Sequence, residues 1–253
     1  MARISVVIPL HNRERYIKRT LDSVLRQTCQ DFEVIVVNDG SIDRSAAKVR
    51  EINDRRIRLI NQCHAGVAAA RNRGIKEAGT ELIALAAAGV VWRPEFLETM
   101  LRLNKLFPAA GVYAAGYEAG QDGGRLARPR FAGIPAHPWE GLVDRYFRVS
   151  CGAELISLAA VAVPRRVFAT VGGFATGLRS GEDREMWARI ALRFPVTYST
   201  AIGGTYYRHD DDGGGRRAPV EEHLFIRKLK EVINSPGCSP QLAADIKAYI
   251  AGS

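Results

Sequence analysis

Apolar runs rich in β-branched residues alternate with segments of helical spacing along the first hundred residues. Ile4 to Pro9 and Phe32 to Val37 are runs typical of strands that are covered on both faces of a parallel sheet. Between them, Ile17, Leu21 and Val24 recur at the spacing of one helix face. This alternation predicts an α/β fold, a doubly wound and mostly parallel sheet flanked by helices.

The same two patterns predict the rest of the chain. Pro94 suits the first turn of the helix that contains it. Residues 120–138, rich in Gly, Pro and Arg, are expected to form a long irregular segment, and residues 210–217 a polar link. The tail from Ala218 is expected to form two helices broken near Ser235. Further strands are expected at residues 57–60, 82–85, 111–118, 158–163, 196–199 and 205–208, and further helices at 43–52, 66–78, 94–104, 165–171 and 184–194.

Three loops are expected to share one crevice. Ligands of doubly wound sheets bind beyond the carboxyl ends of the strands. Residues 10–13, 38–41 and 86–92 follow such ends. Asp39 lies in the second loop, where its carboxylate could accept hydrogen bonds from a nucleobase or ribose, although Asn-Asp-Gly also favours a plain turn. The first strand and helix are not joined by G-x-G-x-x-G, which argues against a dinucleotide.

The charge and the cysteines narrow the class of protein. A net charge of +9 and a pI near 9.6 would attract nucleotides, anionic membranes or nucleic acid, or simply favour solubility. Because no helix-turn-helix, zinc-finger or aromatic RNA-binding motif occurs, nucleic acid is not expected as a partner. The four cysteines lack metal or redox spacing and suit a cytoplasmic protein. No signal peptide and no apolar run of roughly 20 residues occurs, so any membrane contact would be peripheral.

Several stretches, in the right order, resemble glycosyltransferase family 2, the inverting nucleotide-sugar transferases with the GT-A fold. No single stretch is specific, but their order and spacing together are. They are SVVIPLHNRE (Ser5 to Glu14), VIVVNDGSID (Val34 to Asp43), GVAAARNRGIKEAGTELIAL (Gly66 to Leu85), RPEFLE (Arg93 to Glu98), VFATVGGFATGLRSGEDREMWARIAL (Val167 to Leu192) and YYRHD (Tyr206 to Asp210).

The resemblance implies a nucleoside-diphosphate sugar, a UDP-sugar first, as the donor. It implies transfer with inversion to a glycan or lipid-linked acceptor in the assembly of a surface polysaccharide or other glycan. Residues 1–106 would form the nucleotide-sugar-binding half, 107–217 the acceptor-side half of the same domain, and 218–253 a C-terminal helical tail. A lipid-linked acceptor would place the protein at the inner face of the membrane, which suits its basic charge.

The resemblance also assigns binding residues. Asp39 would contact the base or ribose, with Pro9, His11 and Glu14 on the same side. His11 stands where the family often has an aromatic residue, so we expect it either to stack on the base or to be an exposed loop histidine.

Two cationic residues are implied for the diphosphate. Arg71 would pair with phosphate oxygens through its guanidinium, although a solvated arginine is the alternative and Arg73 lies nearby. His209 would reach the diphosphate or a metal, or would be a histidine without a ligand at the end of a strand.

A pair of acids precedes a predicted amphipathic helix. The resemblance makes Asp183 the general base that deprotonates the acceptor hydroxyl, with Glu182 also contacting substrate. Arg184 is expected to keep the Asp183 carboxylate ionised. Capping of the helix amides is the alternative explanation for an acid at this place.

The family's Asp-x-Asp motif is missing. It should fall at residues 87–89, here Ala-Ala-Gly, with a further acid often at Val90. The motif normally holds Mg²⁺ or Mn²⁺, and these side chains supply no oxygen ligand, so no metal site is predicted. Protein cations such as Arg71 could replace the metal, or Asp210 to Asp212 could bind it. Alternatively, the acids were replaced by engineering, or catalysis is lost and the chain is a nucleotide-, sugar- or partner-binding module.

Overall fold

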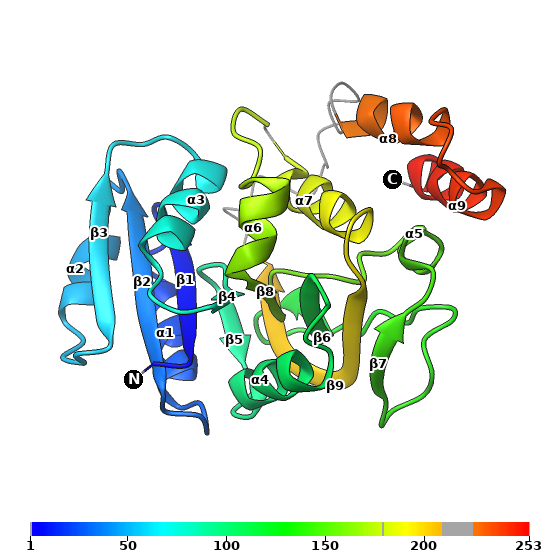
Figure 1. Cartoon of the computed structure of the whole chain (residues 1–253). Helices are drawn as coiled ribbons and strands as arrows, with labels where there is room; N and C mark the ends of the chain where they lie inside the picture. The colour runs from blue at the N-terminus through cyan, green and yellow to red at the C-terminus, as the bar shows by residue number, and fades with distance from the viewer. Residues whose placement is uncertain (1, 179, 209–224, 253) are drawn as a thin grey trace.

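Nine strands form one continuous sheet in the part of the chain that the computed structural model describes, residues 2–178, 180–208 and 225–252 (Figure 1). They are β1 (Ile4–Leu10), β2 (Phe32–Asp39), β3 (Ile57–Gln62), β4 (Leu82–Leu85), β5 (Val90–Trp92), β6 (Val112–Gln121), β7 (Glu140–Val143), β8 (Val161–Pro164) and β9 (Val196–Arg208). Their order is β3-β2-β1-β4-β8-β6-β9-β5, with β7 paired to β9.

Helices cover both faces of the sheet, so the predicted α/β class is confirmed (Figure 1). The two helices predicted for the tail are present, and α9 packs against α5. No helix among the described residues is long and apolar enough to cross a membrane. The helices are α1 (Ile17–Leu25), α2 (Ser45–Arg50), α3 (Val67–Glu77), α4 (Phe96–Leu106), α5 (Tyr146–Val149), α6 (Arg165–Val171), α7 (Glu182–Ala191), α8 (Phe225–Ile233) and α9 (Pro240–Ala251).

The first half of the sheet is parallel throughout. β1 lies between β2 and β4, with Val6 opposite Val34 and Val7 opposite Leu85. All residues of β1 are buried, as its unbroken apolar run predicts. Because β1, β2, β3 and β4 point the same way, their carboxyl ends meet at one edge of the sheet.

Beyond β4 the sheet is mixed. β8 runs antiparallel to both β4 and β6, whereas β6 and β9 are parallel to each other. β5 and β7 are antiparallel to β9. β7 and α5 follow the irregular segment 120–138 and have only four residues each, which is too short for the periodicity of the sequence to predict them. The sheet continues across residue 106 through the pairing of β4 with β8, and the proposed division into halves there stays a prediction.

The prediction of two late strands was wrong, because β9 is one strand of 13 residues. Its pairing with β6 shifts register where Ala115 and Gly116 face Ser199 and Ile202, a bulge that bends the strand without ending it. A glycine within this strand allows close packing against α4. A Cβ on Gly203 would lie 2.7 Å from the Phe96 ring.

The helix predicted to start at Pro94 begins instead at Phe96. The preceding residues Val90–Trp92 form β5, where Val91 pairs with Thr205 of β9. Trp92 also donates its indole N–H to the carbonyl oxygen of Ala159 at 3.0 Å. Pairing with a strand more than a hundred residues away therefore makes residues 90–92 a strand. Pro94 lies in the turn between this strand and α4.

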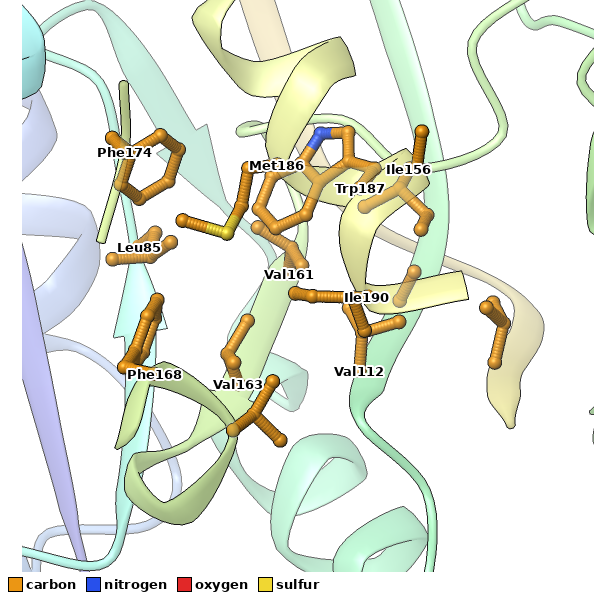
Figure 2. Close-up of a cluster of buried hydrophobic side chains, with 14 of the residues drawn as sticks. Leu85, Val112, Ile156, Val161, Val163, Phe168, Phe174, Met186, Trp187 and Ile190 are labelled. Carbon is orange, nitrogen blue, oxygen red and sulfur yellow. The ribbon is translucent and has the colours of Figure 1, made fainter. Parts of the chain in front are cut away.

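Alternate residues of the central strands supply two hydrophobic clusters, one on each face of the sheet. Val7 belongs to the cluster under α3, α6 and α7, whereas Val6 and Ile8 belong to the cluster under α1 and α4. Figure 2 shows Met186 and Trp187 of α7 among the side chains of the first cluster, as the spacing of α7 predicts.

Helix α3 packs unusually close to the sheet because it carries a glycine at the contact. A Cβ on Gly74 would lie only 2.3 Å from a methyl carbon of Val7. The small residues of α3 were expected to allow such packing, and this close approach sets the height of Arg71 above the carboxyl ends of the strands.

Replacement of Trp187 tests the α7 contact. The side chain is 1% exposed, and its indole N–H has no hydrogen-bond partner among the described residues. We expect Trp187→Ala to lower the free energy of unfolding by about 3–5 kcal/mol, because it leaves a large cavity. Trp187→Phe should cost much less, since the lost N–H was unpaired. Urea unfolding followed by circular dichroism measures both, and equal losses would contradict this account.

Candidate nucleotide-sugar site

A cavity of about 390 Å³ lies at the carboxyl ends of the parallel strands. The loops after β1, β2 and β4 all contribute to it, as predicted from the strand order. Of the residues predicted to bind substrate, Pro9, His11, Asp39 and Arg71 line the cavity. We call this the donor cavity.

Asp39 is almost fully buried, and its carboxylate orders the chain before α3. It accepts hydrogen bonds from the side-chain amide of Gln62 at 2.7 Å and from the backbone N–H groups of Ala65 and Gly66 at 2.8 and 2.9 Å. Burial raises the pKa of Asp39, but these hydrogen bonds and the nearby His64 outweigh it, and the pKa lies below its ordinary value. The carboxylate is therefore an ionised anchor of the turn, while its role toward a base stays a prediction.

Two histidines stack against each other over Asp39. The rings of His11 and His64 have centroids 4.2 Å apart and planes 26° apart. The Nδ1–H of His11 donates to the Asp39 carbonyl oxygen at 2.6 Å, and the Nδ1 of His64 lies 2.9 Å from its carboxylate. The stacking partner of His11 is thus a second histidine, and His11 is a structured part of the cavity.

The sequence reasoning missed His64, although its position pointed to it. His64 comes two residues after β3, and the carboxyl ends of parallel strands meet at the same edge. It also missed Arg13 and Tyr206, which line the cavity from the loop after β1 and from the end of β9. Tyr206 could not be placed at the cavity without knowing that it pairs with Val90 of β5.

The slot of the missing acids faces the donor cavity. Ala87 and Ala88 are half-buried and line it, so methyl groups lie where the family's carboxylates are expected. Among the described residues, the one group of three His, Cys, Asp or Glu side chains close enough for a shared ion is His11, Asp39 and His64.

This group does not fit the family's metals. Mg²⁺ and Mn²⁺ favour oxygen ligands, and imidazole is the ligand of softer ions. The Asp39 oxygens already accept three hydrogen bonds. The Nδ1 of His11 is already bonded to the Asp39 carbonyl oxygen at 2.6 Å. The described residues of the cavity therefore offer no site suited to Mg²⁺ or Mn²⁺.

Arg71, and not Arg73, faces the cavity. Arg71 is 4% exposed, and its guanidinium lies 2.6 Å from the Glu182 carboxylate at the start of α7. Its Nε has no hydrogen-bond partner among the described residues, and the guanidinium lies 5.2 Å from the centre of the Phe174 ring. Arg73 is on the exposed side of α3 and pairs with Glu77 at 3.0 Å. The structure therefore separates these neighbouring arginines.

Asp183 is half-buried beside this ion pair. Desolvation and the negative charge of Glu182 raise the pKa of Asp183, and the charge of Arg71 opposes them only in part. That the charge of Arg184 keeps Asp183 ionised stays a prediction. The Arg184 guanidinium lies 3.7 Å from Glu154, and only its backbone N–H donates to Asp183, at 2.8 Å. A carboxylate with a raised pKa is a stronger base than an ordinary aspartate.

Glu182 and Asp183 are not among the residues that line the donor cavity, and two further predicted residues lie away from it or outside the described chain. The Glu14 carboxylate accepts a hydrogen bond from the backbone N–H of Arg44 at 2.8 Å, at the start of α2, and Glu14 does not line the cavity. Its binding role stays a prediction. His209 and the acids Asp210 to Asp212 lie outside the described residues.

Curated relatives match parts of the chain. An uncharacterized glycosyltransferase of Rickettsia felis is 26% identical over 90% of this chain and 39% of its own length. The uncharacterized glycosyltransferase EpsJ of Bacillus subtilis is 46% identical over 30% of this chain and 22% of its own. Validoxylamine A glucosyltransferase of Streptomyces hygroscopicus subsp. limoneus is 42% identical over 39% of this chain and 23% of its own length. The chain thus spans less than two-fifths of the length of these relatives.

Solved structures match almost the whole chain at low identity. S. aureus TarS 1-349 in complex with UDP-GlcNAc superposes with a TM-score of 0.74 at 17% identity, over 98% of this chain and 73% of that one. The mannosyltransferase PcManGT from Pyrobaculum calidifontis, in complex with GDP-Man and Mn²⁺, superposes with a TM-score of 0.69 at 17% identity, over 99% of this chain and 69% of that one. These likenesses establish the fold.

The sequence model of the family described as Glycosyl transferase family 2 matches residues 5–158, more than half of the chain. The matched span contains β1 to β4, the loops that form the donor cavity, and Arg71. The chain therefore belongs to glycosyl transferase family 2.

Proposed function

We propose that the protein is an inverting glycosyltransferase that moves a sugar from a nucleoside-diphosphate sugar, most readily a UDP-sugar, to a glycan or lipid-linked acceptor. The observation that carries this proposal is the buried Arg71, which lines the donor cavity. A guanidinium held there is suited to a diphosphate, because it presents several N–H groups to phosphate oxygens. The nucleotide sugars bound by TarS and PcManGT support the same donor class.

In this proposal, Asp39 and His11 hold the base and ribose, and Arg71 holds the diphosphate. Asp183 takes the proton of the acceptor hydroxyl as its oxygen attacks the anomeric carbon. The bond from that carbon to the diphosphate oxygen breaks on the opposite face, and the diphosphate leaves with the electron pair. Negative charge thus develops next to Arg71, which must turn part of its guanidinium from Glu182 to the leaving group.

The second candidate is a binding module on the same fold that has lost catalysis. The methyl groups of Ala87 and Ala88 in the donor cavity favour it, because a metal normally stabilises the leaving diphosphate by several kcal/mol. The two candidates differ in turnover. The release of UDP from UDP-glucose or UDP-N-acetylglucosamine would exclude the binding module.

Asp183→Asn tests the general base. Loss of the proton acceptor should lower sugar transfer by about 10²-fold or more, while affinity for UDP stays unchanged. Because the pKa of Asp183 is raised, the transfer rate of the unchanged protein should fall on acidification at a higher pH than an ordinary aspartate would give. UDP release is measured across pH, with calorimetric titration of UDP as the control. Undiminished transfer by the variant would exclude Asp183 as the base.

Arg71→Ala tests the diphosphate contact, with the exposed Arg73→Ala as the matched control. The loss of a charged hydrogen bond should weaken UDP binding about tenfold or more. Affinity for uridine, which lacks the diphosphate, should stay the same and shows that the cavity is still formed. Titrations in EDTA and in Mn²⁺ should agree. UDP binding that requires Mn²⁺ would contradict the proposal that protein cations replace the metal.

A lipid-linked acceptor would bring the protein to the inner, cytoplasmic face of a membrane. We expect the chain, with its charge of +9, to sediment with anionic lipid vesicles at about 0.01 M salt and to be released at about 1 M, as the Debye length falls from about 30 Å to about 3 Å. Neutral phosphatidylcholine vesicles are the control. Failure to sediment with anionic vesicles at low salt would contradict this peripheral contact.

A further inference from the structure

A second cavity, of about 460 Å³, lies between the irregular segment 120–138 and strand β9. Its wall consists of residues 128–131 and 134–137 together with Tyr198 and Thr200. It shares no lining residue with the donor cavity. We call it the loop cavity. Its volume falls within the about 300–1,000 Å³ that is usual for small-molecule sites.

The ionisable groups of the loop cavity are cationic or neutral. Arg128, Arg130 and His137 line it, and no acid is among its lining residues. The guanidinium of Arg128 is held in place by donating to the carbonyl oxygen of Thr200 at 2.7 Å. The side chain of Arg130 makes no hydrogen bond or ion pair with any other described residue. The cavity therefore contains one arginine held by a hydrogen bond, Arg128, and one without a partner among the described residues, Arg130.

The nearest acid along the chain does not cancel this charge. Glu140 follows the segment and is not part of the cavity wall. Its carboxylate pairs with Arg102 of α4 and accepts a hydrogen bond from Ser199 at 3.0 Å. Arg102 thus balances Glu140, and the two arginines of the loop cavity keep their charge for another anion.

Tyr198 adds a buried donor that lacks a partner. The residue is 4% exposed and lines the loop cavity, and its ring meets the Phe131 ring edge to face at 6.0 Å. Its hydroxyl has no hydrogen-bond partner among the described residues. The hydroxyl oxygen is nevertheless not sealed from solvent. The hydroxyl therefore opens into the cavity. Burial raises the pKa of Tyr198 to about 12, against the opposing charge of Arg128, so the hydroxyl stays protonated at neutral pH.

The remainder of the wall is apolar. Phe131, Ile134, Pro129 and Pro135 contribute side chains that could pack against the C–H face of a ring. Guanidinium groups and a phenol hydroxyl that donate, beside such a wall, match a molecule with an apolar ring face and an oxyanion. A sugar that bears a phosphate or carboxylate has this combination.

We propose that the loop cavity binds a saccharide carrying a phosphate or carboxylate group, at a site separate from the donor cavity. Strand β9 connects the two sites, because it supplies Tyr198 and Thr200 to one and Tyr206 to the other. The six residue-to-residue steps from Thr200 to Tyr206 span at most about 20 Å along the strand.

The test is calorimetric titration of the full chain with glucose 6-phosphate, glucuronate, glucose and inorganic phosphate. Glucose 6-phosphate or glucuronate should bind, and the tighter of the two identifies the oxyanion. That acidic sugar should bind more tightly than glucose and than inorganic phosphate. If glucose binds as tightly as the acidic sugars, the proposed role of the arginines is wrong. Inorganic phosphate binding as tightly would overturn the saccharide site, and no binding of either acidic sugar would overturn the proposal as a whole.

Two variants locate the binding. Arg130→Gln removes an exposed charge without a partner, and the matched control Arg125→Gln removes an exposed charge of the same segment that does not line the cavity. Arg130→Gln should weaken the acidic sugar about fivefold or more, Tyr198→Phe should weaken it less, and Arg125→Gln should not change it. UDP affinity should be unchanged in all three variants, which separates this site from the donor cavity. Equal losses for Arg130→Gln and Arg125→Gln would contradict the site.

Discussion

The Asp39 carboxylate determines the shape of the donor cavity. Three hydrogen bonds connect it to the end of β3 and to the backbone just before α3, and its own carbonyl oxygen receives His11. The next residue, Gly40, has a φ of +67°, and a Cβ there would lie 2.8 Å from the backbone nitrogen of His64. The ends of three neighbouring strands are thus fixed relative to one another before any ligand binds.

A second fixed contact joins the two parts of the site. The Arg71–Glu182 ion pair connects α3, which rests on the parallel strands through Gly74, to α7, which lies in the later part of the chain. A pair this deeply buried is costly to break, because either charge left alone would be desolvated and unpaired. The same pair raises the pKa of Asp183 through Glu182 and lowers it through Arg71. The charge of a diphosphate at Arg71 would therefore change the pKa of Asp183.

Ala87 and Ala88 stand where the family resemblance leads us to expect acids, next to the donor cavity. Both residues lie on its wall, between the backbone of β4 and the short strand β5. Without a metal, side chains would have to balance the negative charge of the diphosphate. The described cavity contains the arginines Arg13 and Arg71.

The fold class, the parallel first half and the meeting of His11 and Asp39 at one edge could be predicted from the residues alone, whereas Pro9 and Arg71 were assigned through the family resemblance. The first three features follow from local patterns, since unbroken apolar runs make buried strands and the carboxyl ends of parallel strands must meet. Only the tertiary structure decided the continuous β9, the strand β5 and the direction of Arg184, because partners distant in the chain set them. The stack of His11 on His64 and the loop cavity likewise depend on how separate segments pack, which no local pattern records.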